Sequence, residues 1–232
     1  MKIYEIRTKV YLLEDISLKY LSNVLSNFVD SALCKTDSLI SFHENRQYKY
    51  YCVGNLFPLE RDRVYKKGES YMFSMRTADM SLANYLTEQL SVHRNNQMQG
   101  LESTCRSLRQ KPIDSIATLT PVVIKSEAGY WRSYMTIDEY ENRLCQNVIK
   151  MYQDFTGKQL DVDADFRFYT NLKFLNKKPI VNPYKNVRLL GDKLQLQIAG
   201  DNISQKLAYL LLGTGLGENA CRGMGFCNYR YL

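Results

Sequence analysis

The spacing of hydrophobic residues in the first hundred positions changes between strand-like and helix-like patterns. Residues 2–13 alternate polar and apolar side chains, which predicts a strand. Apolar residues then recur at helical spacing from 18 to 33, and Asp15 is a suitable N-cap for that helix. A polar stretch at 35–47 follows. After it we expect a strand at 48–57, a hairpin with arms at 64–67 and 71–76, and a helix at 81–92 that starts from Asp79.

The second half of the chain repeats this order less completely. Strand-like residues occur near 115–125, and residues 126–131 are the best candidate for a linker between domains. Thr136 and Glu139 have the spacing of a capping box, so a helix is expected from there to Phe155. The remaining expected elements are strands at 166–175 and 194–199, a helix at 203–212 and a final strand at 226–232.

Each half therefore has the order strand, helix, strands, helix, strand, which is that of a βαββαβ unit. We expect an α+β protein made of two tandem ferredoxin-like domains with a glycine-rich loop at the C-terminal end. The N-terminal domain would span residues 1–125 and the C-terminal domain residues 131–232. A chain of 232 residues is long enough to bury a core in each of two small domains.

The charge of the chain suggests an anionic partner. Lys and Arg number 31 against 24 Asp and Glu, which leaves a net charge of +7 and favours nucleic acid or a membrane surface as the partner. The 18 tyrosines offer stacking surfaces for unpaired bases, although most of them are expected to be ordinary strand residues.

Other composition features exclude whole classes of protein. The six cysteines and two histidines form no CxxC pair and no Cys/His cluster, so we predict no metal site and reduced thiols. No apolar run is long enough to span a bilayer, and the N-terminus lacks the apolar run of a signal peptide. We therefore expect a cytoplasmic protein with no membrane partner.

The last eighteen residues contain the most informative motif. Gly215-Leu216-Gly217 and Gly223-Met224-Gly225 are separated by five residues. Glycine permits positive φ and lacks the side chain that would block a ligand, so successive N–H groups of such a loop can face a phosphate. The motif is neither a Walker loop nor a dinucleotide-binding fingerprint. The alternative is a glycine C-cap followed by a flexible turn.

His43 and Lys49 are the candidates for chemistry. Imidazole has a pKa of about 6.5, which suits proton transfer near neutrality, but an isolated histidine in a loop is more often a plain surface residue. Lys49 could stabilise the negative charge of a phosphorane transition state. The other histidine, His93, is interpreted as structural or solvent-facing. The acidic run 161–165 is interpreted as a solvated strand edge, because it lacks the later residues of a calcium-binding loop.

Together, the double glycine motif, His43 and Lys49 resemble a known family. This family comprises the CRISPR-associated endoribonucleases of the RAMP superfamily, which cut precursor CRISPR RNA within its repeats. Its hallmark is a C-terminal loop of the form Gly-apolar-Gly, five residues, Gly-apolar-Gly, which this chain matches in full with Arg222 in the spacer. A histidine after the first helix, then a lysine and a strand, is similar to many members. Some members add a tyrosine from the first helix, where this chain has Phe28, with Tyr20 two turns earlier.

The resemblance implies cleavage without a metal or any other cofactor. The ribose 2′-hydroxyl would attack the adjacent phosphate and leave a 2′,3′-cyclic phosphate and a 5′-hydroxyl. His43 would act as general acid or base, and Lys49 would stabilise the transition state. The residues expected to hold the RNA backbone are Gly215, Gly217, Arg222, Gly223, Gly225, Arg46, Arg61, Arg63, Lys66 and Lys67. For the last five the alternative is a plain solvated strand or hairpin face.

The implied partner is CRISPR repeat RNA, both precursor and processed, and an effector complex and a homodimer stay open. The alternative function is a non-catalytic RNA-binding subunit of the same superfamily that holds CRISPR RNA in an effector complex. A small-molecule enzyme with a phosphate-cradling loop is the least favoured hypothesis.

Overall fold

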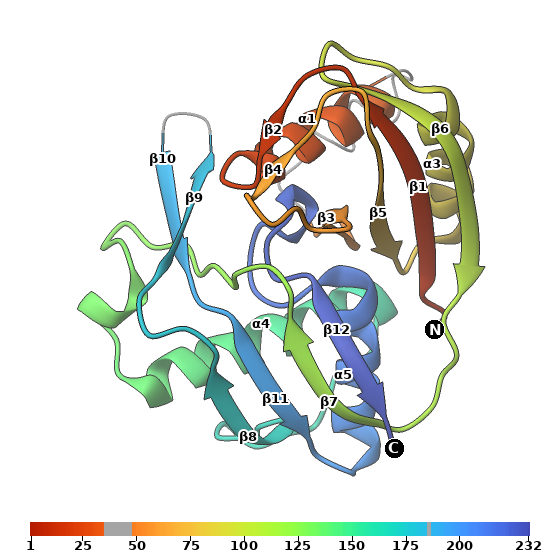
Figure 1. Cartoon of the computed structure of the whole chain (residues 1–232). Coiled ribbons are helices and arrows are strands. Elements are labelled where there is room, and N and C mark those ends of the chain that lie inside the picture. Colours follow the sequence, from red (N-terminus) through yellow and green to blue (C-terminus); the bar gives the residue numbers. More distant parts are fainter. Residues whose placement is uncertain (35–47, 185–186) are drawn as a thin grey trace.

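Two four-stranded antiparallel sheets, each with two helices on one face, form the structure (Figure 1). The computed structural model describes residues 1–34, 48–184 and 187–232. The strand order is β3-β5-β1-β6 in the first sheet and β12-β7-β11-β8 in the second. In both, the first and third strands of the unit lie in the middle, which is the ferredoxin-like βαββαβ arrangement. The predicted fold class is therefore confirmed.

The first unit is built around β1, whose alternating side chains place Ile6 and Val10 in the core with Phe28 of α1. Its main elements are β1 (Tyr4–Leu12), α1 (Leu21–Leu33), β3 (Tyr51–Phe57), β5 (Ser70–Thr77), α3 (Met80–Val92) and β6 (Met98–Ser107). A small additional sheet pairs β2 (Ile16–Ser17) with β4 (Val64–Tyr65). Helix α3 begins as predicted, because the Asp79 side chain accepts hydrogen bonds from two backbone N–H groups of its first turn.

The second unit repeats the arrangement. Its elements are β7 (Ile113–Thr118), η1 (Trp131–Ser133), α4 (Ile137–Thr156), β8 (Tyr169–Phe174), β11 (Leu194–Ile198), α5 (Asn202–Thr214), η2 (Ala220–Arg222) and β12 (Cys227–Tyr231). The predicted capping box opens α4: the Thr136 hydroxyl accepts from the backbone N–H of Glu139, whose carboxylate accepts from the N–H of Thr136. A hairpin of β9 (Ile180–Tyr184) and β10 (Val187–Gly191) is inserted between β8 and β11.

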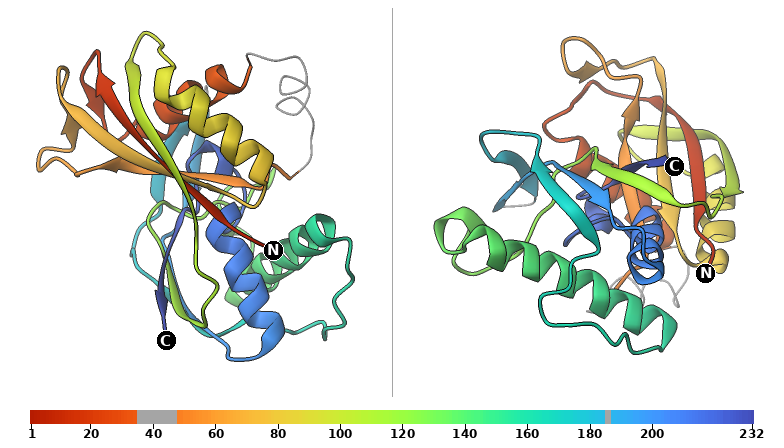
Figure 2. Two further views of the ribbon diagram at one scale, coloured as in Figure 1. Left: turned by 90° about the vertical axis from the view of Figure 1, so that its right-hand side faces the viewer. Right: turned by 90° about the horizontal axis from the view of Figure 1, so that it is seen from below.

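The helices of both units lie on the same side of the molecule, as the left view of Figure 2 shows, and the opposite face of each sheet is left uncovered by helices. Among the described residues, no helix is both long and apolar enough to cross a membrane.

Two local predictions in the first unit were wrong. Asp15 does not cap α1, because residues 16 and 17 pair with β4 and the Asp15 carboxylate accepts from the backbone N–H of Lys67 at 2.7 Å. The predicted hairpin is also absent, since β4 pairs with β2 while β5 pairs with β1 and β3.

The boundary between the two units differs from the expected one. The strand predicted near 115–125 is β7, and it lies in the second sheet between β12 and β11. The fourth strand of the first sheet is β6, which the sequence did not indicate because most of its side chains are polar and exposed. We therefore propose that the units divide at residues 108–112 rather than at residue 125.

Residues 126–131 are not a linker between domains. They connect β7 to α4 within the second unit, and Trp131 at their end is buried. Its indole ring stacks on Tyr140 at 4.1 Å and on Phe174 at 5.5 Å between centroids, and its Nε1 donates to Asp192 at 2.8 Å. The segment is thus part of the core of the second unit.

The two units share a packed boundary. Ile3 and Ala78 of the first unit belong to the core of the second. Gly213 of α5 makes room for Ile3, since a Cβ there would lie 2.6 Å from Ile3 Cδ1. The Tyr209 hydroxyl donates to the carbonyl of Leu108 at 2.8 Å. These contacts fix the position of the segment that follows α5.

Candidate nucleic-acid interface

The double glycine motif connects α5 to β12 at the boundary of the two units (Figure 1). The apolar residue of each triplet, Leu216 and Met224, is fully buried. All four motif glycines adopt positive φ, and the residues and angles are Gly215 at 76°, Gly217 at 81°, Gly223 at 80° and Gly225 at 59°. Glycine adopts this backbone conformation without the strain that other residues experience.

The space left by the missing side chains is occupied by the protein itself. A Cβ on Gly225 would lie 1.9 Å from the carbonyl oxygen of Leu216. A Cβ on Gly217 would lie 2.7 Å from Val122 Cγ1, and one on Gly215 would lie 2.8 Å from Ala220 Cβ. The glycines therefore allow the loop to pack closely on itself and on residues 122–123.

Most of the N–H groups in this loop already have partners. Leu216 N–H donates to the Gly225 carbonyl at 2.9 Å, and Gly225 N–H donates to the Pro121 carbonyl at 2.8 Å. Glu218 N–H donates to Val123, while residues 222–224 donate to carbonyls inside the loop. These groups hold the loop in shape and do not face a phosphate. The groups that remain available to a ligand are the side chains of the five-residue spacer.

Arg222 is the basic side chain of that spacer. Asn219 adopts a left-handed conformation and starts the short turn η2, which contacts both α1 and β3. The Arg222 guanidinium lies over the ring of Tyr184 in β9, 4.7 Å from the centroid. Such a cation–π contact orients the guanidinium while leaving its N–H donors usable. The inserted hairpin thus positions Arg222.

Lys49 of the first unit is close enough to Arg222 for the two charges to interact. Its side chain is half-buried immediately before β3. Burial lowers the pKa of Lys49, and the nearby Arg222 guanidinium lowers it further, whereas Cys221 and Asp30 oppose the shift. Since η2 contacts β3, the fold brings the segments that carry these two cations together, one from each unit.

The backbone around Lys49 is anchored to both units. The Tyr50 carbonyl accepts from the Ala78 N–H at 3.1 Å and from the Thr77 hydroxyl at 2.8 Å in the first unit. The Tyr50 hydroxyl donates to Asp154 of α4, and its ring lies 4.9 Å from that of Phe155. The short segment that carries Lys49 is thus held between the first sheet and the end of α4.

The other predicted site residues have different surroundings. His43 and Arg46 lie outside the described residues. Arg61, Arg63, Lys66 and Lys67 lie on or beside β4, and the Lys66 ammonium pairs with Asp62. This group is next to the start of α1, because the Arg63 carbonyl accepts from the Leu18 N–H at 2.9 Å.

The two aromatic candidates in or near α1 are clearly distinguished. Phe28 is fully buried in the core of the first unit and cannot contact a substrate. Tyr20 is 50% exposed at the N-cap of α1, two residues before Ser22, whose Cβ faces Gly223. Tyr20 is therefore the one that is accessible beside the glycine loop.

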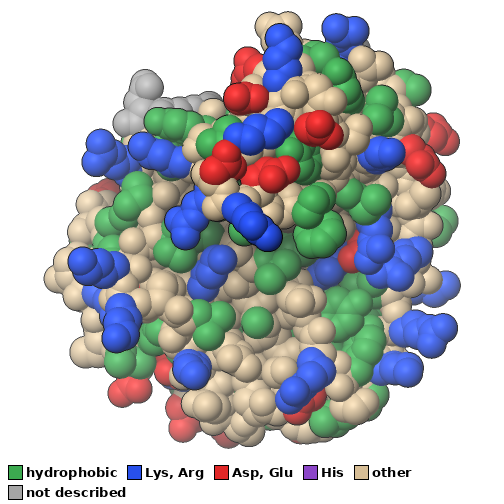
Figure 3. Space-filling model, viewed as in Figure 1, with side chains coloured by type: hydrophobic (Ala, Val, Ile, Leu, Met, Phe, Trp, Pro, Cys, Tyr) green, Lys and Arg blue, Asp and Glu red, His purple; other side chains and the backbone are tan. Residues whose placement is uncertain are grey.

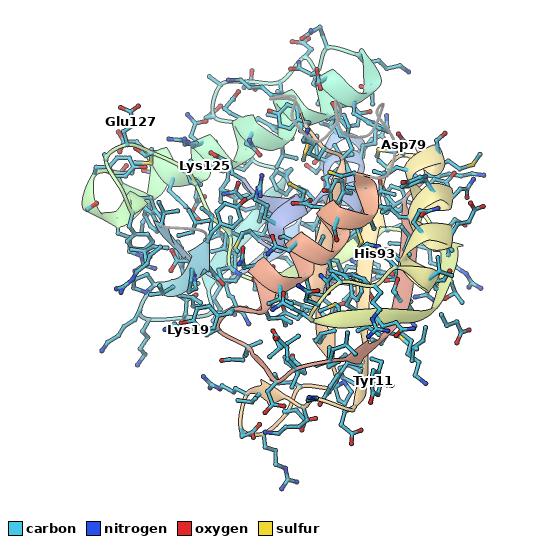
Figure 4. The ribbon with its side chains drawn as sticks, turned by 90° about the horizontal axis from the view of Figure 1, so that it is seen from above. Tyr11, Lys19, Asp79, His93, Lys125 and Glu127 are labelled. Carbon is cyan, nitrogen blue, oxygen red and sulfur yellow. The ribbon has the colours of Figure 1, made fainter. Side chains whose placement is uncertain are left out.

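His93 and the acidic run have no place in this interface. His93 is buried at the end of α3, with Nε2 2.7 Å from the Ser31 hydroxyl and its ring 4.9 Å from Phe28 (Figure 4), so its role is structural. The three aspartates of 161–165 are exposed in the connection between α4 and β8 rather than on a strand. Within the described ranges, no group of three or more His, Cys, Asp or Glu could hold a metal ion.

Basic side chains are distributed over both halves of the face shown in Figure 3 rather than gathered in one cluster.

Comparison with known proteins identifies relatives of this architecture. The family model described as "CRISPR associated protein Cas6, C-terminal" matches residues 106–229. Among solved structures, "An RAMP protein binding different RNA substrates" matches with a TM-score of 0.73 at 15% identity, covering 98% of this chain and 99% of that one. A "Cas6-related gene" product from Pyrococcus furiosus matches with a TM-score of 0.70 at 17% identity, covering 98% of both chains.

A third structure, a Cas6 product complex, matches with a TM-score of 0.64 at 14% identity over 99% of both chains. No protein with a curated description matches the chain. At these identities the structural matches establish a common fold.

Proposed function

Since the chain belongs to the Cas6 family of CRISPR-associated proteins, whose C-terminal model covers more than half of its residues, we propose that it cleaves CRISPR precursor RNA within the repeats. The product would be guide RNA with a 2′,3′-cyclic phosphate, and the other fragment would begin with a 5′-hydroxyl. The observation that carries this proposal is that η2, which carries Arg222, packs on β3, the strand that follows Lys49, at the boundary of the units.

Two neighbouring cations suit a phosphodiester anion better than they suit most other ligands. The accessible Tyr20 and the basic group around β4 lie near the same end of α1. An RNA strand that passes over the start of α1 would therefore meet Arg222 on one side and Arg61, Arg63, Lys66 or Lys67 on the other. Arg46 is proposed as a further phosphate contact.

The reaction needs little from the protein, because the RNA supplies the nucleophile. The bond from the 2′-oxygen to phosphorus forms, and the bond from phosphorus to the 5′-oxygen breaks. A base takes the 2′-hydroxyl proton and an acid returns a proton to the leaving oxygen. In this proposal His43 performs proton transfer, Lys49 neutralises charge on the phosphorane, and Arg222 holds a flanking phosphate. This chemistry requires no cofactor.

The glycine loop acts in this proposal as a frame rather than as a phosphate cradle. Its glycines fix the path of the backbone, and its spacer delivers Arg222. The RNA partner fits a cytoplasmic protein that works alone, as a homodimer or with an effector complex.

The test is cleavage of repeat RNA in EDTA by the wild type and by the variants His43→Ala, Lys49→Ala and Lys158→Ala. Loss of proton transfer should slow cleavage by about 10²–10⁴-fold in His43→Ala. Lys158 is exposed beyond the end of α4, so its variant is the matched control for charge and should cleave normally. RNA with a 2′-deoxy nucleotide upstream of the cut should bind and stay whole.

Cleavage that required added magnesium, or that survived in His43→Ala, would overturn the mechanism. Tight binding of repeat RNA by the wild type without any cleavage would instead identify a binding subunit.

A further inference from the structure

A cavity of about 250 Å³ lies directly beside the Lys49 segment. Four parts of the chain form its wall: Tyr48, Ile124, the loop residues Gly217 and Glu218, and one face of α4 that includes Asn147 and Lys150. Ile124 and Leu144 supply an apolar surface. The cavity therefore adjoins both the glycine loop and the proposed cleavage centre.

The ring of Tyr48 is held at this cavity by its neighbours. It lies 6.1 Å from the ring of Tyr50, which contacts Phe155 and donates to Asp154. Tyr48 is itself half-buried. An aromatic ring fixed in this way is a preformed stacking surface, so little ordering is required when a flat ligand binds.

The polar groups of the cavity are not fully used by the protein. Asn147 Oδ1 is buried and has no hydrogen-bond partner among the described residues. A buried acceptor of this kind is costly unless a ligand or water donates to it. Arg143 is engaged with Glu218 at 3.4 Å and with the Lys125 carbonyl (Lys125 is labelled in Figure 4), whereas Lys150 is exposed and forms no ion pair with a described residue.

We propose that this cavity receives one unpaired base of the repeat RNA, stacked on Tyr48, and that the Asn147 amide turns so that its buried Oδ1 accepts a hydrogen bond from the edge of the base. Each of the four bases has a π-face and at least one N–H donor on its edge, so the site accepts a base as a class. Lys150 contacts the phosphate of the same or the next nucleotide. The inference rests on the proposed function, because it places this base next to the phosphate that Lys49 faces.

The experiment is an abasic scan combined with a substitution of Tyr48. Repeat RNAs blocked by a 2′-deoxy nucleotide at the cut carry a single abasic nucleotide at each position near it. Their binding is measured with the wild type, Tyr48→Leu, Tyr48→Phe and Tyr11→Leu. Tyr11 is an exposed tyrosine of β1, shown in Figure 4 on the first sheet away from α4, and it serves as the matched control.

One abasic position should weaken wild-type binding by about 5- to 150-fold, the loss expected for one stacked base. Tyr48→Leu should weaken binding of intact RNA by a similar factor but should not weaken binding of that abasic RNA further. Tyr48→Phe keeps the ring and should bind as the wild type does. Thermal unfolding of each variant shows whether the fold is intact.

The cavity assignment would be wrong if Tyr48→Leu weakened the binding of every abasic RNA as much as that of intact RNA. It would also be wrong if Tyr48→Leu bound intact RNA as tightly as the wild type does. Either result would leave the proposed function in place. If the wild type neither bound nor cut repeat RNA, the proposed function would fail and the cavity assignment with it.

Discussion

Nη1 of Arg76 donates a 2.6 Å hydrogen bond to the backbone carbonyl of Cys227, which joins β5 of the first sheet to β12 of the second. The same guanidinium pairs with Glu5 at 3.0 Å and lies 4.6 Å from the ring centroid of Phe226. Arg76 is only 6% exposed. It therefore links the two units where the glycine loop enters the second sheet.

Replacing Arg76 with methionine should destabilise the protein by about 3–5 kcal/mol, the usual cost of breaking a buried ion pair from one side. Chemical denaturation measures the free energy of unfolding. Arg7→Met is the matched control, because Arg7 pairs with the same Glu5 but its side chain is 45% exposed, and the loss there should stay within about 1 kcal/mol. Equal losses in the two variants would contradict the assigned role of Arg76.

Glu5 should make stability depend on pH in the acid range. Burial alone raises the pKa of Glu5, but Arg76, Arg106 and Arg7 outweigh burial and hold it below the ordinary value of 4.5. A carboxylate with a lowered folded-state pKa stabilises the fold above its unfolded pKa, and this contribution disappears as the pH falls through the folded pKa. Urea unfolding of the wild type and Glu5→Gln should therefore differ most near pH 7. The difference should shrink below pH 4.5, and a constant difference would refute the ion-pair explanation.

Gly225→Ala should destabilise the protein by more than about 1 kcal/mol, because the new Cβ meets the Leu216 carbonyl and the residue has positive φ. Gly200→Ala is the matched control, since a Cβ there has no neighbour within 4 Å and no positive φ is recorded. Thermal unfolding of Gly225→Ala and Gly200→Ala measures the difference in their stability. If Gly225→Ala folded as stably as the control but lost RNA binding, the glycine would be a ligand contact rather than a packing requirement.

Arg222→Gln should weaken binding of single-stranded repeat RNA at low salt and reduce the slope of log K against log salt by about 0.7, the value expected for one lost phosphate contact. Tyr184→Leu should produce a smaller loss because it removes the ring under the guanidinium, while Tyr184→Phe should retain binding. An unchanged slope in Arg222→Gln would exclude a phosphate contact by this side chain.

Lys49 should set the alkaline limit of cleavage. Its pKa is lowered mainly by burial, so the positive charge is lost at a lower pH than the ordinary value of 10.5. If cleavage needs the charged form of Lys49, the cleavage rate should therefore decline with rising pH at a pH below 10.5. Arginine stays charged at these pH values, so the decline in Lys49→Arg should move to higher pH or vanish. If the wild type and Lys49→Arg lost activity at the same alkaline pH, a group other than Lys49 would be responsible for the loss.

Elements with strong local signals were predictable from the sequence. Helix α4 begins at its capping box, and α3 begins at Asp79, because both caps depend on side chains within three residues. Strand β6 was missed because it lies at a sheet edge with mostly polar, exposed side chains, and its omission moved the expected domain boundary by one strand. The hairpin that carries Tyr184 was also missed, since Pro183 within β9 is unfavourable for a strand.

The candidate site was predictable only in part, because its neighbours are set by tertiary packing. A glycine pattern indicates where positive φ or close approach is needed, but it does not identify the neighbour that approaches. In this loop the neighbours are Leu216, Val122 and Ala220. The proximity of the Lys49 segment to η2, which carries Arg222, depends on how the two units pack, and no local pattern encodes that packing.

In the glycine loop, the residues that fix the backbone are different from those whose side chains are accessible. The triplets and the carbonyls of Pro121 and Val123 fix the path of the chain, while side chains between Glu218 and Arg222 are only half-buried. If the proposed function holds, replacing Glu218 or Arg222 should alter the contacts with RNA, while the triplets and the left-handed Asn219 keep the path of the chain. A library restricted to positions 218 and 222 is therefore a direct test of whether this loop sets the repeat preference.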